Sequence, residues 1–477
     1  MNEKDVVCSK KYGKEGYSSS IAFDKEINCE VHYVIDFKQK YVIFESSFST
    51  PLRQIILLLD RTCRIIECMD DMGKSLAYMR ELDKLNIEND TPFILLKIRY
   101  SYESNSNCEY MMNDNSGLLA NIIYPNVDKK IKIAYKQKKN VYYNKLESNT
   151  LTELYGYYRE AKFCCTIKDN NVDIRVNKYG YCHDFLNKIL KEFHDYYFAI
   201  FNYPIEVAII DSAEISCDAL SLEKLILVKE EICEKNSLFL YRYLLHELVH
   251  QIIGIKIKFK GYGGEWLKEG LTEYIQVIFF EKKYNKNMGL RMVEYYRKLY
   301  FAYREYDTLS ISETYTMMPV EQFNAVIGAK GFFVIRTLLD YFDEDELTVI
   351  KKMCEDLLMY KKRISIEDFF IIMQNLCNRD LTQFYNDWIK RSGIPKLILR
   401  WKYIDGRVII NFIQEKDNIY SMSVNLRLIY KTQKMDKCFY VSKSKENFEI
   451  LTLEKPQYIL IEPEFRILMD MEAYEAT

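Results

Sequence analysis

The sequence predicts a multidomain α+β protein in which a β-rich first part is followed by a mainly helical part and then by a second β-rich part. Its 477 residues are enough for two or three domains. From about residue 182 the apolar residues change from strand-like alternation to spacings of three and four, which are typical of helices. Alternating runs return after residue 395.

The first part, residues 1–178, is expected to form an N-terminal β-sandwich. Short runs rich in β-branched and aromatic residues are separated by polar stretches, as in antiparallel sheets. These runs lie at 29–37, 41–45, 54–60 and 93–102. The 70s and 80s contain helix-like sequence within this β-rich part.

The middle part, residues 179–394, is expected to be helical. The run at 183–201 spaces its apolar residues at three and four. Ser365 is a candidate helix N-cap, with Asp368 three residues later. The last helix of this part should end near Gly393.

The final part, residues 395–477, returns to strands and is expected to form a small C-terminal β-sandwich. Asp405 and Gly406 lie between two alternating runs, a pattern that indicates a β-hairpin with a two-residue turn.

Composition excludes several classes of protein. The formal net charge of −2 gives no basic surface for nucleic acid, so no nucleic-acid partner is expected. No apolar run approaches the ~18 residues of a membrane-spanning helix, and the first residues show no signal peptide. The thirteen cysteines include no Cys-x-x-Cys pair, which favours free thiols in a reducing cytoplasm. We therefore expect a soluble, cytoplasmic protein of undetermined oligomeric state.

The stretch "LLHELVHQIIG" at 244–254 is a candidate metal site. A helix over 238–253, capped by Asn236 or Ser237 and ended by Gly254, would project residues four apart from one face. His246 and His250 could then bind one ion, and Glu247, about 100° around the helix, could act on a water bound to it. This is the His-Glu-x-x-His arrangement of metallopeptidases. A buried histidine pair satisfied by hydrogen bonds is the alternative.

A catalytic zinc needs a third protein ligand and an open position, and Glu269 provides the candidate. Eighteen residues separate it from His250, and Gly261, Gly263 and Gly264 supply a turn between two helices. The neighbours of Glu269 on its predicted helix include Trp266, Leu267, Leu271 and Tyr274, so its carboxylate needs a partner. The sequence therefore predicts one Zn²⁺ per chain.

The motifs "HELVHQIIG" and "WLKEGLTEY", with their eighteen-residue spacer, resemble the gluzincin zinc metallopeptidases of the aminopeptidase N (membrane alanyl aminopeptidase) family. The resemblance implies a thermolysin-like catalytic domain over 179–394, between two β-sandwiches. It also implies that His246, His250 and Glu269 bind zinc, that Glu247 is the general base, and that the substrate is a peptide.

Two positions depart from the family pattern. The tyrosine that stabilises the oxyanion falls at Gly328 when Lys330-Gly331 are aligned, and Tyr315 is a possible substitute. The glutamate that binds the substrate amine falls at Ser221, with Asp218 or Glu223 as nearby acidic alternatives.

These departures leave three functions open. An aminopeptidase is favoured, while an endopeptidase of the same fold and a catalytically attenuated, zinc-containing relative that binds a peptide or partner are the alternatives. Retention of Glu247 argues for an enzyme. Glu273, four residues after Glu269, is a candidate to orient a ligand histidine through its second ring nitrogen, or else a solvent-facing charge.

Overall fold

The structure is a computed structural model. It describes residues 28–36, 39, 41–59, 63–81, 84–101, 128–137, 140–148, 163–168, 171–176, 205–210, 218–222, 225–229, 232, 237–314, 320–360 and 363–476. These residues fall into two compact units, Met1–Gly261 and Tyr262–Thr477. The helix predicted at 183–201, together with Tyr315 and Glu223, lies outside the described residues. The three predicted domain ranges stay predictions.

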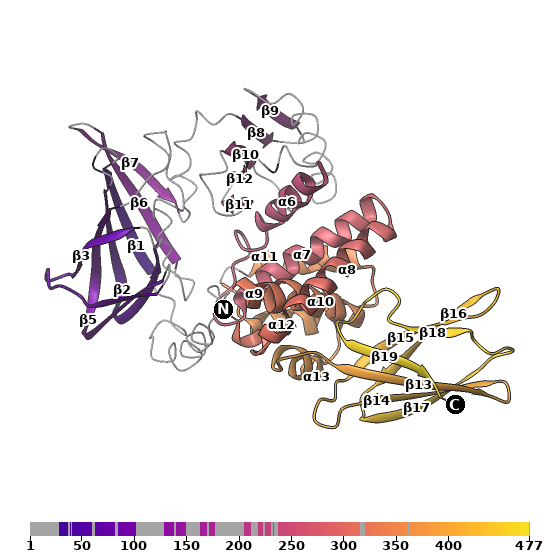
Figure 1. Cartoon of the computed structure of the whole chain (residues 1–477). Coiled ribbons are helices and arrows are strands. Elements are labelled where there is room, and N and C mark those ends of the chain that lie inside the picture. Colours follow the sequence, from indigo (N-terminus) through magenta and orange to yellow (C-terminus); the bar gives the residue numbers. More distant parts are fainter. Residues whose placement is uncertain are drawn as a thin grey trace. The chain divides into compact units, whose positions relative to one another are not determined.

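A seven-stranded sheet opens the first unit (Figure 1). Its strands are β1 (Asn28–Asp36), β2 (Tyr41–Leu58), β3 (Arg64–Asp70), β4 (Tyr78–Glu81), β5 (Lys84–Ser101), β6 (Asp128–Gln137) and β7 (Asn140–Ser148). The strand order is β3-β5-β2-β1-β6-β7, and β4 pairs with β5. All four strand runs predicted from the sequence begin within β1, β2 or β5, and each ends inside that strand or within two residues of its end, so these strands are confirmed.

The helix-like sequence in the 70s and 80s forms no helix among the residues that the structure describes there, because β4 and the start of β5 occupy part of that stretch and pair with each other. Pairing with a neighbouring strand outweighs a weak local preference.

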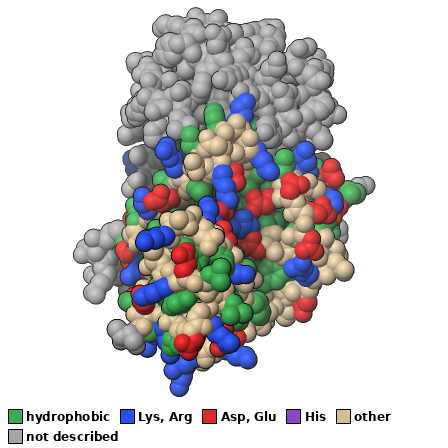
Figure 2. All heavy atoms as spheres, turned by 90° about the vertical axis from the view of Figure 1, so that its right-hand side faces the viewer, with side chains coloured by type: hydrophobic (Ala, Val, Ile, Leu, Met, Phe, Trp, Pro, Cys, Tyr) green, Lys and Arg blue, Asp and Glu red, His purple; other side chains and the backbone are tan. Residues whose placement is uncertain are grey.

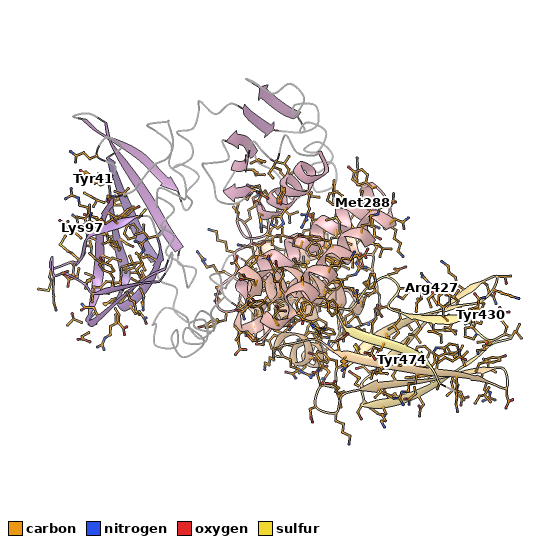
Figure 3. The ribbon with its side chains drawn as sticks, in the orientation of Figure 1. Tyr41, Lys97, Met288, Arg427, Tyr430 and Tyr474 are labelled. Carbon is orange, nitrogen blue, oxygen red and sulfur yellow. The ribbon has the colours of Figure 1, made fainter. Side chains whose placement is uncertain are left out.

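In β2, Val42 and Phe44 alternate into the core at 0% and 1% exposure. On the polar side, Lys97 of β5 pairs with Glu45 of β2 at 2.6 Å. Figure 3 labels Lys97 on this sheet.

A second sheet of the first unit has five strands in the order β11-β12-β10-β8-β9. They are β8 (Phe163–Lys168), β9 (Asn171–Val176), β10 (Ile205–Ile210), β11 (Ala219–Leu222) and β12 (Leu225–Lys229). The helix α6 (Ser237–His250) follows and contacts β11 and β12. The short strand β11 is therefore an edge strand of this sheet as described. It also contacts α6, the helix that carries both candidate histidine ligands.

The second unit begins with helices. They are α7 (Gly264–Lys283), α8 (Lys286–Tyr303), η2 (Arg304–Tyr306), η3 (Ile311–Glu313), α9 (Val320–Gln322), η4 (Phe323–Lys330), α10 (Gly331–Leu338), η5 (Leu339–Tyr341), α11 (Glu346–Met359), α12 (Ile366–Cys377), α13 (Thr382–Phe384) and η6 (Tyr385–Ile389). The segments η4 and η6 are π-helices.

Ser365 caps α12 in a reciprocal capping box with Asp368, as the sequence predicts. Gly393 follows the last helical segment with φ of 75°.

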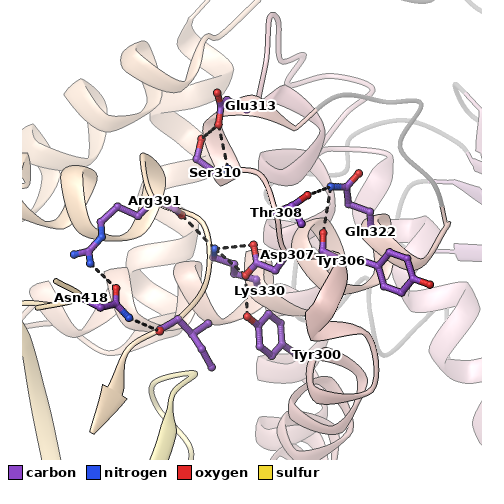
Figure 4. A network of polar contacts seen from close by, with 11 residues as sticks. Tyr300, Tyr306, Asp307, Thr308, Ser310, Glu313, Gln322, Lys330, Arg391 and Asn418 are labelled. Atoms are coloured by element: carbon purple, nitrogen blue, oxygen red, sulfur yellow. Dashed lines mark hydrogen bonds and ion pairs between the residues drawn. The ribbon is translucent and has the colours of Figure 1, made fainter. Parts of the chain in front are cut away.

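A buried ion pair joins three segments of this unit (Figure 4). The Lys330 ammonium, at the end of η4, lies 3.1 and 3.2 Å from the two carboxylate oxygens of Asp307 and also donates to the Arg391 carbonyl. The Tyr300 hydroxyl of α8 donates to the same carboxylate at 2.8 Å. Burial lowers the pKa of Lys330, and Asp307 opposes that shift. A buried charge needs such partners, so the pair fixes the end of η4 against α8.

Residues on both sides of Asp307 bind the N-terminal end of the π-helix η4. The Gln322 amide donates to the Tyr306 carbonyl at 3.2 Å and to the Thr308 hydroxyl at 3.3 Å. Ser310 and Glu313 close a capping box around η3 in the same loop (Figure 4). Both ends of η4 are thus tied to one loop.

Gly270 of α7 and Gly331 of α10 bring two helix backbones into close approach. A Cβ at Gly270 would lie 2.9 Å from the Gly331 carbonyl carbon and 3.0 Å from its oxygen. A Cβ at Gly331 would meet its nearest atoms only at 3.7 Å, an ordinary contact distance. The contact is therefore asymmetric, and Gly270 is the residue that cannot be larger.

Two sheets end the chain, with strand orders β17-β14-β13-β19 and β16-β15-β18. Their strands are β13 (Lys396–Ile404), β14 (Arg407–Gln414), β15 (Met422–Ile429), β16 (Lys434–Val441), β17 (Lys445–Leu451), β18 (Tyr458–Ile461) and β19 (Asp470–Glu475). Phe439 of one sheet lies 5.9 Å from Phe412 and 4.8 Å from Phe448 of the other, ring centre to ring centre. The sheets thus share an aromatic core.

The predicted hairpin joins β13 to β14, with Ile404 opposite Arg407. Asp405 and Gly406 both have positive φ, 48° and 76°. This matches the turn type that an Asp-Gly pair favours, because that turn needs positive φ at both positions.

Several surface charges on the second unit are paired across strands and helix turns. Arg427 of β15, labelled in Figure 3, binds Asp436 of β16 through two nitrogens at 2.6 and 2.9 Å. Arg407 and Glu449 form a more exposed pair at 2.8 Å. Figure 2 shows basic and acidic side chains mixed over one face of the molecule.

Cys63, Cys68 and Cys354 are buried free thiols. Within the described ranges, every helix is too short or too polar to cross a lipid bilayer.

The asymmetric glycine contact yields a prediction for stability. We expect Gly270→Ala to lower the free energy of unfolding by roughly 1–3 kcal/mol, because neither backbone can move aside for the methyl group. Gly331→Ala is the matched control and should be neutral or stabilising by up to about 1 kcal/mol, since alanine is the better helix former. Urea unfolding followed by circular dichroism measures both. Equal midpoints for the two variants would contradict the close approach.

Candidate metal centre

Two imidazole nitrogens converge on one face of α6. His246 and His250 stand one turn apart, and their Nε2 atoms lie 2.9 Å from each other. Their ring planes are nearly perpendicular at 83°, with centres 4.5 Å apart. The sequence predicted this pairing from the four-residue spacing. A nitrogen pair at this distance suits either a shared proton or a common cation.

The end of α6 orients the His250 ring. Nδ1 of His250 lies 3.1 Å from the Ile253 carbonyl. A proton on Nδ1 would be donated to that oxygen and would leave the Nε2 lone pair available to a metal. The helix stops at His250, three residues earlier than predicted, and Ile253 belongs to the following turn. Gly254, predicted to adopt a left-handed conformation, has φ of 107°.

Glu269 lies on α7, the first helix of the second unit. Its carboxylate is 3.1 Å from the Lys268 ammonium, which also binds Glu265 at 2.5 Å. Burial disfavours the charge on Lys268, but Glu265 and Glu269 outweigh that effect and raise its pKa. Trp266 and Leu271, predicted to surround Glu269 with apolar surface, are buried at 0% and 1% exposure.

The three candidate ligand residues each offer one ligand atom, and these atoms all lie within 4.8 Å of one another. Two imidazole nitrogens and one carboxylate oxygen are the ligand types that zinc accepts, and three protein ligands leave a position for water or substrate. The donor chemistry and the orientation of His250 through its other ring nitrogen therefore fit a zinc ion.

Glu247 follows His246 on the same turn of α6 and is 7% exposed. Its backbone carbonyl, 2.9 Å away, accepts a hydrogen bond from the Ser221 hydroxyl of β11. The Gln251 amide donates to the same hydroxyl. The side chain at position 221 is thus bonded to the helix, where the family pattern would have a glutamate that binds the substrate amine.

Glu273 lies one turn after Glu269 on α7 and is half-buried. Its Oε2 accepts a hydrogen bond from the hydroxyl of Tyr296 on α8. The Tyr296 ring stacks on Phe332 with centres 4.6 Å apart. Sequence reasoning missed Tyr296, because it is 23 residues away from Glu273 and belongs to no motif.

Gly328 lies within the π-helix η4 and is half-buried. A Cβ built there meets one atom within 4 Å, the Phe323 carbonyl oxygen at 3.8 Å. Its φ is not positive, unlike that of Gly261 or Gly263. The position therefore does not require glycine.

Residues 181–388 match the model of the peptidase family M1 domain. A human protein, endoplasmic reticulum aminopeptidase 2, is 23% identical over 259 residues, which cover 44% of this chain and 26% of that protein. A crystal structure of Legionella pneumophila aminopeptidase A in complex with aspartic acid superposes with a TM-score of 0.65 at 15% identity. The match covers 96% of this chain and 61% of the bacterial one.

The chain thus spans about a quarter of the human relative and less than two thirds of the bacterial protein. At 15% identity the structural likeness concerns the fold alone. The matched domain contains the His-Glu-x-x-His helix and Glu269, in the order and spacing that the sequence analysis found. The findings together support an aminopeptidase N-like gluzincin family member, with a region similar to the peptidase family M1 domain over residues 181–388.

Proposed function

We propose that this protein is a zinc-dependent metallopeptidase that hydrolyses peptide bonds, with aminopeptidase activity favoured. One observation carries the proposal: the ligand atoms of His246, His250 and Glu269 lie within 4.8 Å of one another. The family M1 match over residues 181–388 supports it independently.

In this proposal the three residues hold one zinc ion per chain. When bound, zinc would polarise the scissile carbonyl and lower the pKa of a water molecule toward about 7. The Ile253 carbonyl keeps the His250 ring aimed through Nδ1. The Lys268 ammonium balances the charge of the Glu269 carboxylate.

Glu247 is proposed as the general base. A carboxylate can accept a proton from the attacking water and deliver it to the leaving amine. Its low exposure of 7% keeps bulk water from solvating the carboxylate, and this strengthens its electrostatic effect on the reacting groups. Glu247 directly follows His246, one of the proposed zinc ligands, in α6.

Two observations keep the alternatives in view. The Ser221 hydroxyl is hydrogen-bonded to the Glu247 carbonyl and the Gln251 amide. Position 221 therefore offers no carboxylate to bind a substrate amine, and this favours an endopeptidase. Gly328 carries no hydroxyl for an oxyanion, which favours an attenuated enzyme. Cleavage of one peptide library in free and N-acetylated form distinguishes them: an aminopeptidase cuts free peptides only, an endopeptidase cuts both, and an attenuated relative cuts neither.

The first prediction concerns zinc content. Elemental analysis of gently purified protein should find about one zinc per chain, because three protein ligands suffice for tight binding. His246→Ala and Glu269→Ala should each retain little or none. His32→Ala, which removes an exposed histidine of β1, is the control and should keep the wild-type content. Full zinc in both ligand variants would overturn the assignment.

The second prediction concerns the base. Glu247→Gln should keep its zinc and fold but lose roughly 10²–10⁴-fold in kcat, because the carboxamide preserves shape and cannot accept the proton. Glu449→Gln on the exposed strand β17 controls for loss of a carboxylate and should be unaffected. Steady-state kinetics on any cleaved peptide measures both. A Glu247→Gln enzyme within a few-fold of wild type would exclude Glu247 as the base.

The third prediction uses the open space at Gly328. Gly328→Tyr should raise kcat by up to about 10²–10³-fold, because a phenol placed there would donate to the developing oxyanion of the substrate. The absence of close atoms around the built Cβ supports a folded variant. Gly328→Phe is the matched control, with the same ring and no hydroxyl. A folded, zinc-loaded Tyr variant no faster than the Phe variant would show that another group supplies the donor.

A further inference from the structure

The edge strand β11 is bonded to α6 through one serine. Among the described strands, β11 pairs only with β12, where Ser221 lies opposite Ile226. The Ser221 hydroxyl donates to the Glu247 carbonyl at 2.9 Å and accepts from the Gln251 amide. A single hydroxyl thus links the strand to the last turn of α6 and to the residue that follows the helix.

The same bonds complete the end of α6. The last four carbonyls of a helix have no partner inside the helix. Here the carbonyls of Leu248 and Val249 accept backbone N–H groups of the following turn at 2.9–3.1 Å, and that of His250 accepts Ile255 at 3.3 Å. The fourth carbonyl, that of Glu247, accepts the Ser221 hydroxyl. The strand therefore contributes to the helix end that carries the proposed base and a proposed ligand.

Burial makes the link costly to lose. Gln251 is 0% exposed, and a buried carboxamide must keep its hydrogen bonds. Removal of the Ser221 hydroxyl would take away the acceptor that the Gln251 amide uses here. We therefore expect the Ser221–Gln251 contact to oppose sliding or lifting of β11 on the helix.

We propose that Ser221 and Gln251 are positioning residues that hold the edge strand β11 at one register beside Glu247. The inference rests on the proposed function. The outer edge of β11 offers backbone groups to an extended peptide, which can add to a sheet as a further strand. The strand is tied to the backbone of Glu247, so a peptide bound along it would be placed relative to that carboxylate.

In this proposal the Ser221 side chain binds other residues of the protein and does not contact the substrate amine. Loss of the hydroxyl should therefore loosen peptide binding while the chemical step and the zinc ligands stay intact. A residue that merely supported folding would change stability without separating KM from kcat.

The test compares Ser221→Ala with Ser221→Thr, which keeps the hydroxyl and suits a strand. Ser47→Ala, at an exposed serine of β2, is the matched control. Hydrogen–deuterium exchange of residues 218–222 and 248–251, zinc content and steady-state kinetics are measured on the full chain. In Ser221→Ala we expect roughly 10-fold faster exchange in both segments, as follows from loss of a buried hydrogen bond. Zinc should be unchanged, and KM should rise roughly 10-fold with kcat within a few-fold.

Ser221→Thr and Ser47→Ala should both behave like wild type. Unchanged exchange in Ser221→Ala, or a Thr variant as loose as the Ala variant, would overturn the proposed link. Faster exchange with an unchanged KM would overturn the positioning role. A wild type that cleaves no peptide would refute the proposed function, while the exchange measurements would still decide whether the link exists.

Discussion

The helical part of the second unit depends on one buried charge pair. Lys330 and Asp307 are almost completely shielded from solvent, so each needs the other, and Tyr300 and the Arg391 carbonyl complete their hydrogen bonds. Removing one partner of such a pair commonly costs about 3–5 kcal/mol, because the remaining charge stays buried. Through these contacts α8, the loop at 307–314, the π-helix and the segment leading to the final strands hold one arrangement.

Different physical devices hold the proposed ligands in place. The His250 ring is aimed by a backbone carbonyl three residues ahead, so its direction follows from how α6 ends. Glu269 directly precedes Gly270, where the backbones of α7 and α10 approach closely, so the packing of these two helices places its backbone. Glu273, a candidate to orient a ligand histidine, accepts a hydrogen bond from Tyr296, and its proposed role stays a prediction.

Local patterns predicted much of the fold and the ligand set. Four-residue spacing indicated that His246 and His250 share a helix face, and the Asp405-Gly406 and Ser365–Asp368 pairs indicated a turn and a cap. Each of these depends on residues within a few positions of one another. The Ser221–Gln251 and Asp307–Lys330 contacts join residues 30 and 23 positions apart, and no local pattern encodes them. The helix-like sequence in the 70s and 80s was misleading for the same reason, since pairing of β4 with β5 decides part of that stretch.

The π-helix Phe323–Lys330 has a consequence for how chain length can vary in this fold. Its backbone hydrogen bonds join residues five apart, whereas those of an α-helix join residues four apart. Deletion of one residue here would let the segment relax to an α-helix while Lys330 keeps its place at Asp307. The same deletion inside α7 would rotate every later side chain by about 100°. A one-residue deletion is therefore better tolerated within these eight residues than inside α7. Gly328 aligns with different positions of an α-helical relative, depending on which of the eight residues is counted as the extra one.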